Sequence, residues 1–346
     1  MKKLKVGVLG LGCISYSHIP AYQNNPDVEL YAVCDKSESW LNYRAKQLNI
    51  SHMYTDYKKL LENPEIDAVS VCLPTKFHAE ASIYALNAGK HVLCEKPMAI
   101  NAKEAEAMCE AAKKNGKKLM ISHNQRFDLD VQLMQKRMKE GFFGDIYFAR
   151  IGWRRSLGML PEQDLVRENG EHYSRNWFNE KDNGGGVLRD LGSHLLDLTM
   201  FVTDFPKFVS ADASCYRKFY VPGYDGSYVC DSEDLASAHL KFDTGLAIQM
   251  EVSFGSLIER EALFTEIYGT KGGASRRDGK LKFIKDNGGI CETEEITKYD
   301  LESKCSQARF ADAVLNDTEV PVTPEQGLGV IGILDAIYKS AGDVKK

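Results

Sequence analysis

The chain has 346 residues, of which 43% are hydrophobic and 27% charged, and its formal net charge is −5. This length suits two domains, and the composition is that of a soluble globular protein. The charge balance excludes the strongly basic surface that nucleic acid or an anionic membrane attracts, so we expect neither as a partner.

Nine cysteines are scattered along the chain without any CxxC pair. An odd number of isolated thiols is typical of reduced cysteines in the cytosol, so we expect a cytoplasmic protein with no metal site. The apolar run at residues 6–13 is short and broken by glycine, which indicates a strand rather than a secretion signal. No run approaches the roughly 20 apolar residues of a membrane span.

The first strand, residues 6–9, leads into the sequence GLGCIS at residues 10–15. Its glycine spacing is that of a dinucleotide-binding turn: Gly10 permits a tight turn, and Gly12 lets a pyrophosphate approach the start of the next helix. A second strand ends in Asp35, at the distance where an acid holds the ribose hydroxyls. Because this carboxylate repels a 2′-phosphate, we expect NAD rather than NADP, although Lys36 or Arg44 would favour the phosphate.

Strands and helices then alternate up to residue 122, which predicts a doubly wound parallel sheet with ligands beyond the carboxyl ends of its strands. Thr75, His78 and Glu95 lie at such ends. His78 suits a surface position at a helix start as well as a cofactor contact. Lys96, between Glu95 and Pro97, suits a donor to a substrate hydroxyl whose oxygen gains charge during oxidation.

The pattern changes after residue 124. An irregular stretch, residues 152–183, is rich in aromatic and basic side chains, which suit sugar faces and hydroxyls. It predicts a wall of the substrate pocket, while a loop packed on a partner subunit would have a similar composition. Strands at about residues 208–216, 235–242, 247–254 and 263–268 predict a mostly antiparallel sheet, and a last helix is expected at 324–340.

Three glycines, residues 184–186, precede a predicted helix on which Asp190, His194 and Asp197 recur at i, i+4 and i+7. An imidazole one turn from a carboxylate has the support that a general base needs. A solvated polar face or a capped core histidine fits the same residues. A metal site is disfavoured because no HExxH-type spacing accompanies them.

Together, the Rossmann half ending in Glu95-Lys96-Pro97, the three glycines and the D-x-G-x-H-x-x-D pattern at residues 190–197 resemble the glucose–fructose oxidoreductase/inositol dehydrogenase (Gfo/Idh/MocA) family. The resemblance implies an α/β plus α+β protein with two domains. Residues 1–123 would form a Rossmann domain with a doubly wound parallel sheet. Residues 124–346 would form a substrate-binding and oligomerisation domain with a mostly antiparallel open sheet, whose last helix is able to pack back on the first domain.

The resemblance further implies NAD(P)-dependent oxidation of a secondary hydroxyl on a sugar, glycoside or cyclitol. By position, Lys96 orients the hydroxyl, His194 is the general base and Asp190 supports it. The residues expected to line the cofactor are Gly10, Gly12, Cys13, Ile14, Asp35, Thr75, His78, Glu95 and Lys96. Those expected to contact substrate are Arg126, Trp153, Arg155, Trp177 and Asp197, the last of which alternatively holds the helix.

Two other functions are considered: an NADPH-dependent keto-sugar reductase and a non-catalytic NAD-binding regulator. The regulator would be free to lose the lysine, the histidine and the acid, all of which are present. A half-exposed antiparallel sheet and the family resemblance both favour a homodimer or homotetramer.

Overall fold

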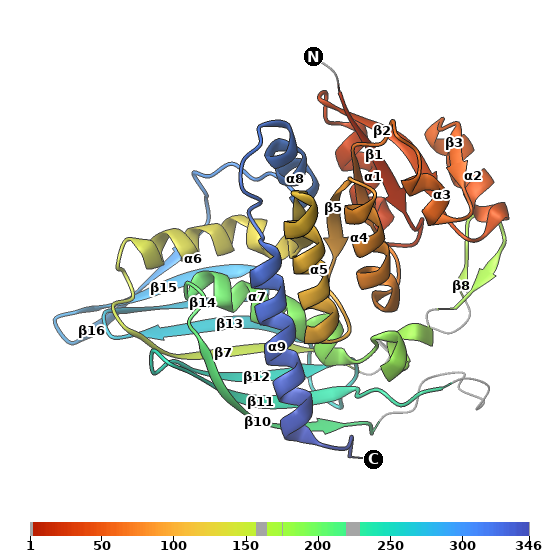
Figure 1. Cartoon of the computed structure of the whole chain (residues 1–346). Helices are drawn as coiled ribbons and strands as arrows, with labels where there is room; N and C mark the ends of the chain where they lie inside the picture. The colour runs from red at the N-terminus through yellow and green to blue at the C-terminus, as the bar shows by residue number, and fades with distance from the viewer. Residues whose placement is uncertain (1–2, 157–164, 175, 219–228, 346) are drawn as a thin grey trace.

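The computed structural model describes residues 3–156, 165–174, 176–218 and 229–345 (Figure 1). The described residues contain two large sheets, one of six strands and one of eight strands. In the described ranges, no helix combines the length and apolar character needed to span a membrane. No group of His, Cys, Asp and Glu side chains in the same ranges is arranged to hold a metal ion.

The first sheet has six parallel strands in the order β3-β2-β1-β4-β5-β6. They are β1 (Leu4–Leu9), β2 (Val28–Cys34), β3 (His52–Tyr54), β4 (Ala68–Val71), β5 (His91–Glu95) and β6 (Leu119–Ser122). The helices between them are α1 (Ser15–Gln23), α2 (Glu38–Leu48), α3 (Tyr57–Leu61), α4 (His78–Asn87) and α5 (Ala102–Asn115). Every residue of β4 and β6 is buried because helices cover both faces of the sheet. The predicted doubly wound sheet is confirmed.

Local signals fix the ends of these helices. The Ser37 side chain accepts a hydrogen bond from the Trp40 N–H at the start of α2, and the Asn101 side chain does the same for α5. Gly116 ends α5 in the left-handed conformation that favours glycine, with φ of 59°. These caps are visible in the sequence and mark where α2 begins and where α5 begins and ends.

The second sheet has eight strands in the order β10-β11-β12-β7-β13-β14-β15-β16. They are β7 (Ile146–Arg154), β10 (Phe208–Tyr216), β11 (Leu235–Phe242), β12 (Ala247–Ser253), β13 (Ala262–Gly269), β14 (Gly272–Arg277), β15 (Lys280–Asn287) and β16 (Ile290–Ile296). Only β7 and β12 pair in parallel, so the sheet is mostly antiparallel, as predicted. The prediction missed β14, β15 and β16. The strand β16 is exposed along nearly its whole length and lacks the alternating apolar residues that mark a half-buried strand.

The helices α6 (Leu129–Lys139), α7 (Ser193–Val202) and α9 (Pro324–Ala341) lie against one face of this sheet, and α8 (Ser306–Leu315) packs near α1 (Figure 1). The helix α9 also returns to the first sheet, where it contacts α5 and β6. Its Asp335 carboxylate accepts a hydrogen bond from the Ala102 N–H at 2.8 Å. A Cβ at Gly327 would lie 2.8 Å from Ile121, so α9 rests directly on β6.

The predicted irregular stretch, residues 152–183, contains the end of β7 and a small hairpin of β8 (Leu165–Val166) and β9 (His172–Tyr173). Two short 3₁₀ turns follow, Asn176–Asn179 and Lys181–Asn183. Residues 157–164 and 175 of this stretch lie outside the described ranges.

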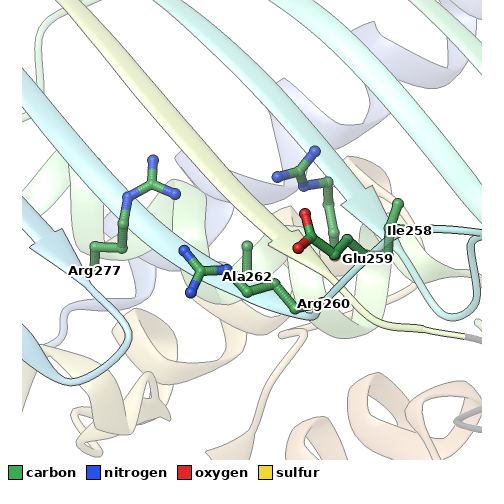
Figure 2. A pocket seen from close by; sticks show the side chains of 6 residues that line it. Ile258, Glu259, Arg260, Ala262 and Arg277 are labelled. Atoms are coloured by element: carbon green, nitrogen blue, oxygen red, sulfur yellow. The ribbon is translucent and has the colours of Figure 1, made fainter.

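The open face of the second sheet carries a basic pocket (Figure 2). The Arg154 and Arg277 guanidinium groups lie 6.0 and 4.5 Å from the centre of the Phe264 ring. The pocket, of about 320 Å³, is lined by Arg154, Ile258, Glu259, Arg260, Ala262 and Arg277. Trp153 alternates with Arg154 along β7 and therefore points to the opposite, helix-covered face. The pocket is thus separate from the polar groups described next.

Candidate active site

The glycine turn after β1 has the shape that a dinucleotide phosphate requires. Gly10 has φ of +92°, and a Cβ there would lie 2.5 Å from the Cys72 carbonyl oxygen, so only glycine fits. A Cβ at Gly12 would meet no atom within 4 Å, which leaves open space against the backbone at the start of α1. Ser15, at the third position of the motif, is fully buried and donates its hydroxyl hydrogen to the Gly12 carbonyl oxygen at 2.7 Å. The serine therefore supports the turn.

Asp35 lies beside this turn at the end of β2. Its carboxylate accepts hydrogen bonds from the N–H groups of Leu11 and Ser37, each at 3.0 Å. Cys13 and Ile14, on the other side of the turn, are exposed. These residues thus surround an open surface at the carboxyl end of β1 and β2, where such folds bind a dinucleotide.

Lys96 follows β5 and reaches into the second domain. Its Nζ donates hydrogen bonds to Asp190 Oδ1 at 2.7 Å and to the Asp190 carbonyl oxygen at 3.0 Å. The two side chains are only 14% and 20% exposed. This pair links the motif after β5 with the segment before α7. The two hydrogen bonds use two of the three hydrogens of the Lys96 ammonium group.

His194, the second residue of α7, lies near this pair. Burial first, and then the positive charge of Lys96, hold the pKa of His194 well below its ordinary value. Its Nδ1 is buried and has no hydrogen-bond partner among the described residues. The Trp153 ring lies 6.0 Å from the imidazole, and the Arg155 guanidinium lies 5.1 Å from the Trp153 ring. His194 as a whole is half-buried, so part of the residue stays accessible.

The expected contact between Asp190 and His194 is not formed. Residues Leu188–Gly192 form a π-helical turn before α7 begins at Ser193, so the α-helical i, i+4 spacing does not hold across them. The Asp190 carboxylate is directed to Lys96 instead. Its geometry is therefore that of a group that positions the lysine rather than the histidine.

Arg126 and Asp197 were predicted to contact substrate, but they bind each other in the protein interior. Both are 1% exposed. Arg126 donates two hydrogen bonds to the Asp197 carboxylate, at 2.7 and 2.5 Å, and a third to Gln326 Oε1 of α9 at 2.6 Å. The neighbouring His123 Nε2 lies 3.7 Å from Asp197. This arrangement replaces the predicted substrate role with a structural one, since neither side chain reaches open space.

His78 and Glu95 are also held by the protein itself. His78 is 1% exposed, and its ring nitrogens lie 2.8 and 2.7 Å from the carbonyl oxygens of Pro97 and Leu73, so the predicted cofactor contact is corrected to a link between two strand ends. Burial, the largest single effect, raises the pKa of Glu95, but His18, which lies 2.8 Å away, together with Ser122 and Lys96 outweighs it and leaves this pKa below its ordinary value. Sequence reasoning missed His18, whose only signal is a polar residue on an otherwise apolar side of α1.

Of the three glycines, Gly184 brings the second domain against the first, and Gly186 packs within the second domain. A Cβ at Gly184 would lie 2.8 Å from the buried side chain of Thr75 and 2.7 Å from Ile100. Gly186 has φ of +110°, and a Cβ there would lie 2.4 Å from the Glu233 carboxylate. Thr75 therefore forms part of the domain contact. Trp177, predicted to face substrate, stacks on Phe178 with ring centres 3.7 Å apart.

Both halves of the chain are similar to known oxidoreductases. A family model described as "Oxidoreductase family, NAD-binding Rossmann fold" matches residues 4–123, and a "GFO/IDH/MocA C-terminal domain" model matches residues 131–275. The chain is 29% identical to D-glucoside 3-dehydrogenase of Escherichia coli (strain K12), over 98% of this chain and 95% of that protein. It is 25% identical to scyllo-inositol 2-dehydrogenase (NADP(+)) IolW of Bacillus subtilis (strain 168), over 98% and 94%.

Among solved structures, a levoglucosan dehydrogenase in complex with NADH superimposes with a TM-score of 0.86 over 98% of this chain and 97% of that one. The two sequences are 22% identical, so this likeness concerns the fold.

Proposed function

Because this chain belongs to the Gfo/Idh/MocA family of oxidoreductases with an NAD-binding Rossmann fold, we propose that it is an NAD(H)-dependent dehydrogenase that oxidises a secondary hydroxyl of a sugar, glycoside or cyclitol. The observation that carries the proposal is the neighbourhood of Lys96 and His194. A fixed ammonium group and an unpartnered, neutral imidazole are together what the oxidation of an alcohol needs.

The residues around the glycine turn fit a dinucleotide. The open space at Gly12 and the start of α1 would hold the pyrophosphate, and Asp35 would hold the ribose hydroxyls. When bound, NAD⁺ supplies the acceptor for the hydride that leaves the carbon bearing the hydroxyl. Proton transfer and the positioning of the hydroxyl are proposed to be carried out by side chains of this protein.

His194 is the proposed general base. Because its pKa is held low, the imidazole is neutral near pH 7 and is ready to accept a proton. The imidazole of His194, a residue that is only half-buried, is proposed to take the hydroxyl proton.

Lys96 is proposed to orient the hydroxyl and to stabilise its oxygen as charge develops. Two of its ammonium hydrogens are donated to Asp190, which leaves one for the substrate oxygen. Asp190 is accordingly a positioning residue. Trp153 and Arg155, which lie beside His194, are proposed to contact the substrate ring.

The substrate class rests on the relatives. The two curated relatives act, by their names, on a D-glucoside and on scyllo-inositol, so a ring bearing several secondary hydroxyls is the proposed substrate. An aromatic face such as Trp153 and a donor such as Arg155 suit a ring of this kind.

We also propose that the chain forms a homo-oligomer and works in the cytoplasm. The open face of the second sheet, including the pocket of Figure 2, is a surface that another copy is able to cover. All nine cysteines are free thiols, as in proteins of a reducing compartment.

The test is NAD⁺ reduction by the purified protein on a panel of inositols, hexoses and glycosides, with His194→Ala measured beside it. We expect turnover on one substrate class and a loss of about 10²–10⁴-fold in the variant, the usual contribution of a general base. NADH affinity should stay nearly unchanged. His239→Ala is the control, because His239 is exposed on β11, and it should keep full activity.

Equal activity of His194→Ala would refute the assignment of the base. Reduction of keto-sugars with NADPH, together with silence in the oxidative assay, would favour the reductase. Tight NADH binding without turnover in either direction would favour the non-catalytic regulator.

A further inference from the structure

The small β8–β9 hairpin, residues 165–173, extends from the second domain to the first (Figure 1). Its Arg167, Glu168 and Glu171 side chains contact α1 and α2. The Arg167 guanidinium lies 5.0 Å from the Trp40 ring of α2. The Tyr173 hydroxyl lies 3.9 Å from Cys13 Sγ in the glycine turn. The hairpin therefore borders the surface assigned above to the dinucleotide.

One carboxylate of the hairpin occupies the start of α2. Glu171 Oε2 accepts hydrogen bonds from the hydroxyls of Ser37 at 2.7 Å and Ser39 at 2.6 Å. Glu171 Oε1 accepts another from Arg167 at 2.9 Å. The Ser37 oxygen also accepts from the Trp40 N–H, which turns its hydrogen toward Glu171. The hydrogen bond from Ser39, above all, lowers the pKa of Glu171, so the group is an anion at neutral pH.

The Glu171 carboxylate lies close to Asp35, the acid expected to hold the ribose hydroxyls. The Ser37 N–H donates to Asp35 Oδ1, so the two hydroxyls belong to the turn that follows the ribose-binding acid. NADP differs from NAD by a 2′-phosphate on that ribose, and a phosphate needs donors or a cation close to this acid. Ser37, Ser39 and the positive end of α2 are such donors, and Glu171 already takes them.

We propose that Glu171 determines the cofactor specificity of this chain: its carboxylate fills the place at Ser37 and Ser39 that a 2′-phosphate would need, so the enzyme selects NAD(H) over NADP(H). This inference rests on the proposed function as a dehydrogenase. It assigns the selection to two acids from different domains, Asp35 after β2 and Glu171 on the hairpin.

Two of the nearby cations do not oppose this selection, whereas Lys36, exposed beside Asp35, would favour a phosphate. Arg44, expected from the sequence to be able to meet a phosphate, is 6% exposed and lies 4.2 Å from the Tyr16 ring, so it is unavailable. Arg167 is paired with Glu171. Its guanidinium would be released if the glutamate were lost.

The test compares the binding of NADH and NADPH to the full-length protein, titrated without substrate and followed by cofactor fluorescence. Wild type should bind NADH more tightly. In Glu171→Gln, NADPH affinity should rise by about tenfold or more, because a like charge is removed from beside the phosphate. NADH affinity should change by less than about threefold, since Asp35 remains.

Glu168→Gln is the matched control. Glu168 lies on the same hairpin and also loses one charge, but it binds Tyr16 on α1 and Tyr43 and Gln47 in the later turns of α2. This variant should loosen the hairpin equally and leave the NADH:NADPH ratio unchanged. A second variant, Glu171→Gln with Ser39→Ala, should lose part of the gained NADPH affinity.

An unchanged ratio in Glu171→Gln would overturn the inference, and so would an equal change in both hairpin variants. A wild type that binds NADPH as tightly as NADH would overturn it as well. If wild type bound neither cofactor, the proposed function would fail first, so the two failures are distinguishable.

Discussion

Replacing Arg126 with methionine should destabilise the fold by about 3–5 kcal/mol, because it leaves the Asp197 carboxylate charged and buried without its partner. Asp197 is 1% exposed and accepts two hydrogen bonds from this guanidinium. The lost bond to Gln326 also loosens α9. The loss should lie near the lower limit, since His123, 3.7 Å away, is able to take up a proton and become a substitute cation.

Thermal unfolding followed by circular dichroism measures this effect, with protein concentration held constant. The double variant Arg126→Met with Asp197→Leu is the control. It removes both charges and should recover much of the stability, because the burial of an unpaired charge, rather than the loss of attraction, causes most of the damage. A variant Arg126→Met with unchanged stability but a strongly raised KM would refute this reasoning and restore a substrate role for Arg126.

Two further predictions concern single residues away from the proposed chemistry. Burial lowers the pKa of His123 to about 4 from an ordinary 6.5, so between these pH values only the unfolded chain binds a proton at this residue. The free energy of unfolding should therefore fall by about 3 kcal/mol as the pH drops from 6.5 to 4. His123→Asn should flatten the pH dependence of the melting temperature. Equal slopes in both proteins would contradict this. Gly186→Ala should lower the melting temperature because φ at Gly186 is +110° and the new Cβ would lie 2.4 Å from Glu233. Gly329→Ala on α9, where a Cβ would meet no atom within 4 Å, is the control and should not lower it. An unchanged melting temperature in Gly186→Ala would disprove the close approach.

The sequence predicted the structure best where helices, strands and turns depend on residues close together in the chain. The parallel sheet follows from alternating apolar strands and capped helices, and its prediction is confirmed together with the family. The strands β14 to β16 were missed because they lie toward one edge of the sheet, where most of their residues are exposed or only half-buried. Their pairing depends on β13, which local patterns do not reveal.

Contacts between distant residues account for the remaining differences at the site. Lys96 and His194 were predicted from their motifs, but the pairing of Lys96 with Asp190 joins residues 94 positions apart. The π turn before α7, which moves Asp190 away from His194, has no clear sequence signal. Arg126 and Asp197 were expected to contact substrate from the family resemblance, and only the fold brings the two side chains together.

The return of α9 to the first domain affects how the chain is made. This helix rests on β6 through Gly327, yet roughly 200 residues separate the two elements along the chain. At ribosomal speeds of about 5–20 residues per second, Ile121 and the adjoining surface of α5 stay uncovered for on the order of 10–40 s. The first sheet is thus translated early but covered on this side only when α9 has been made.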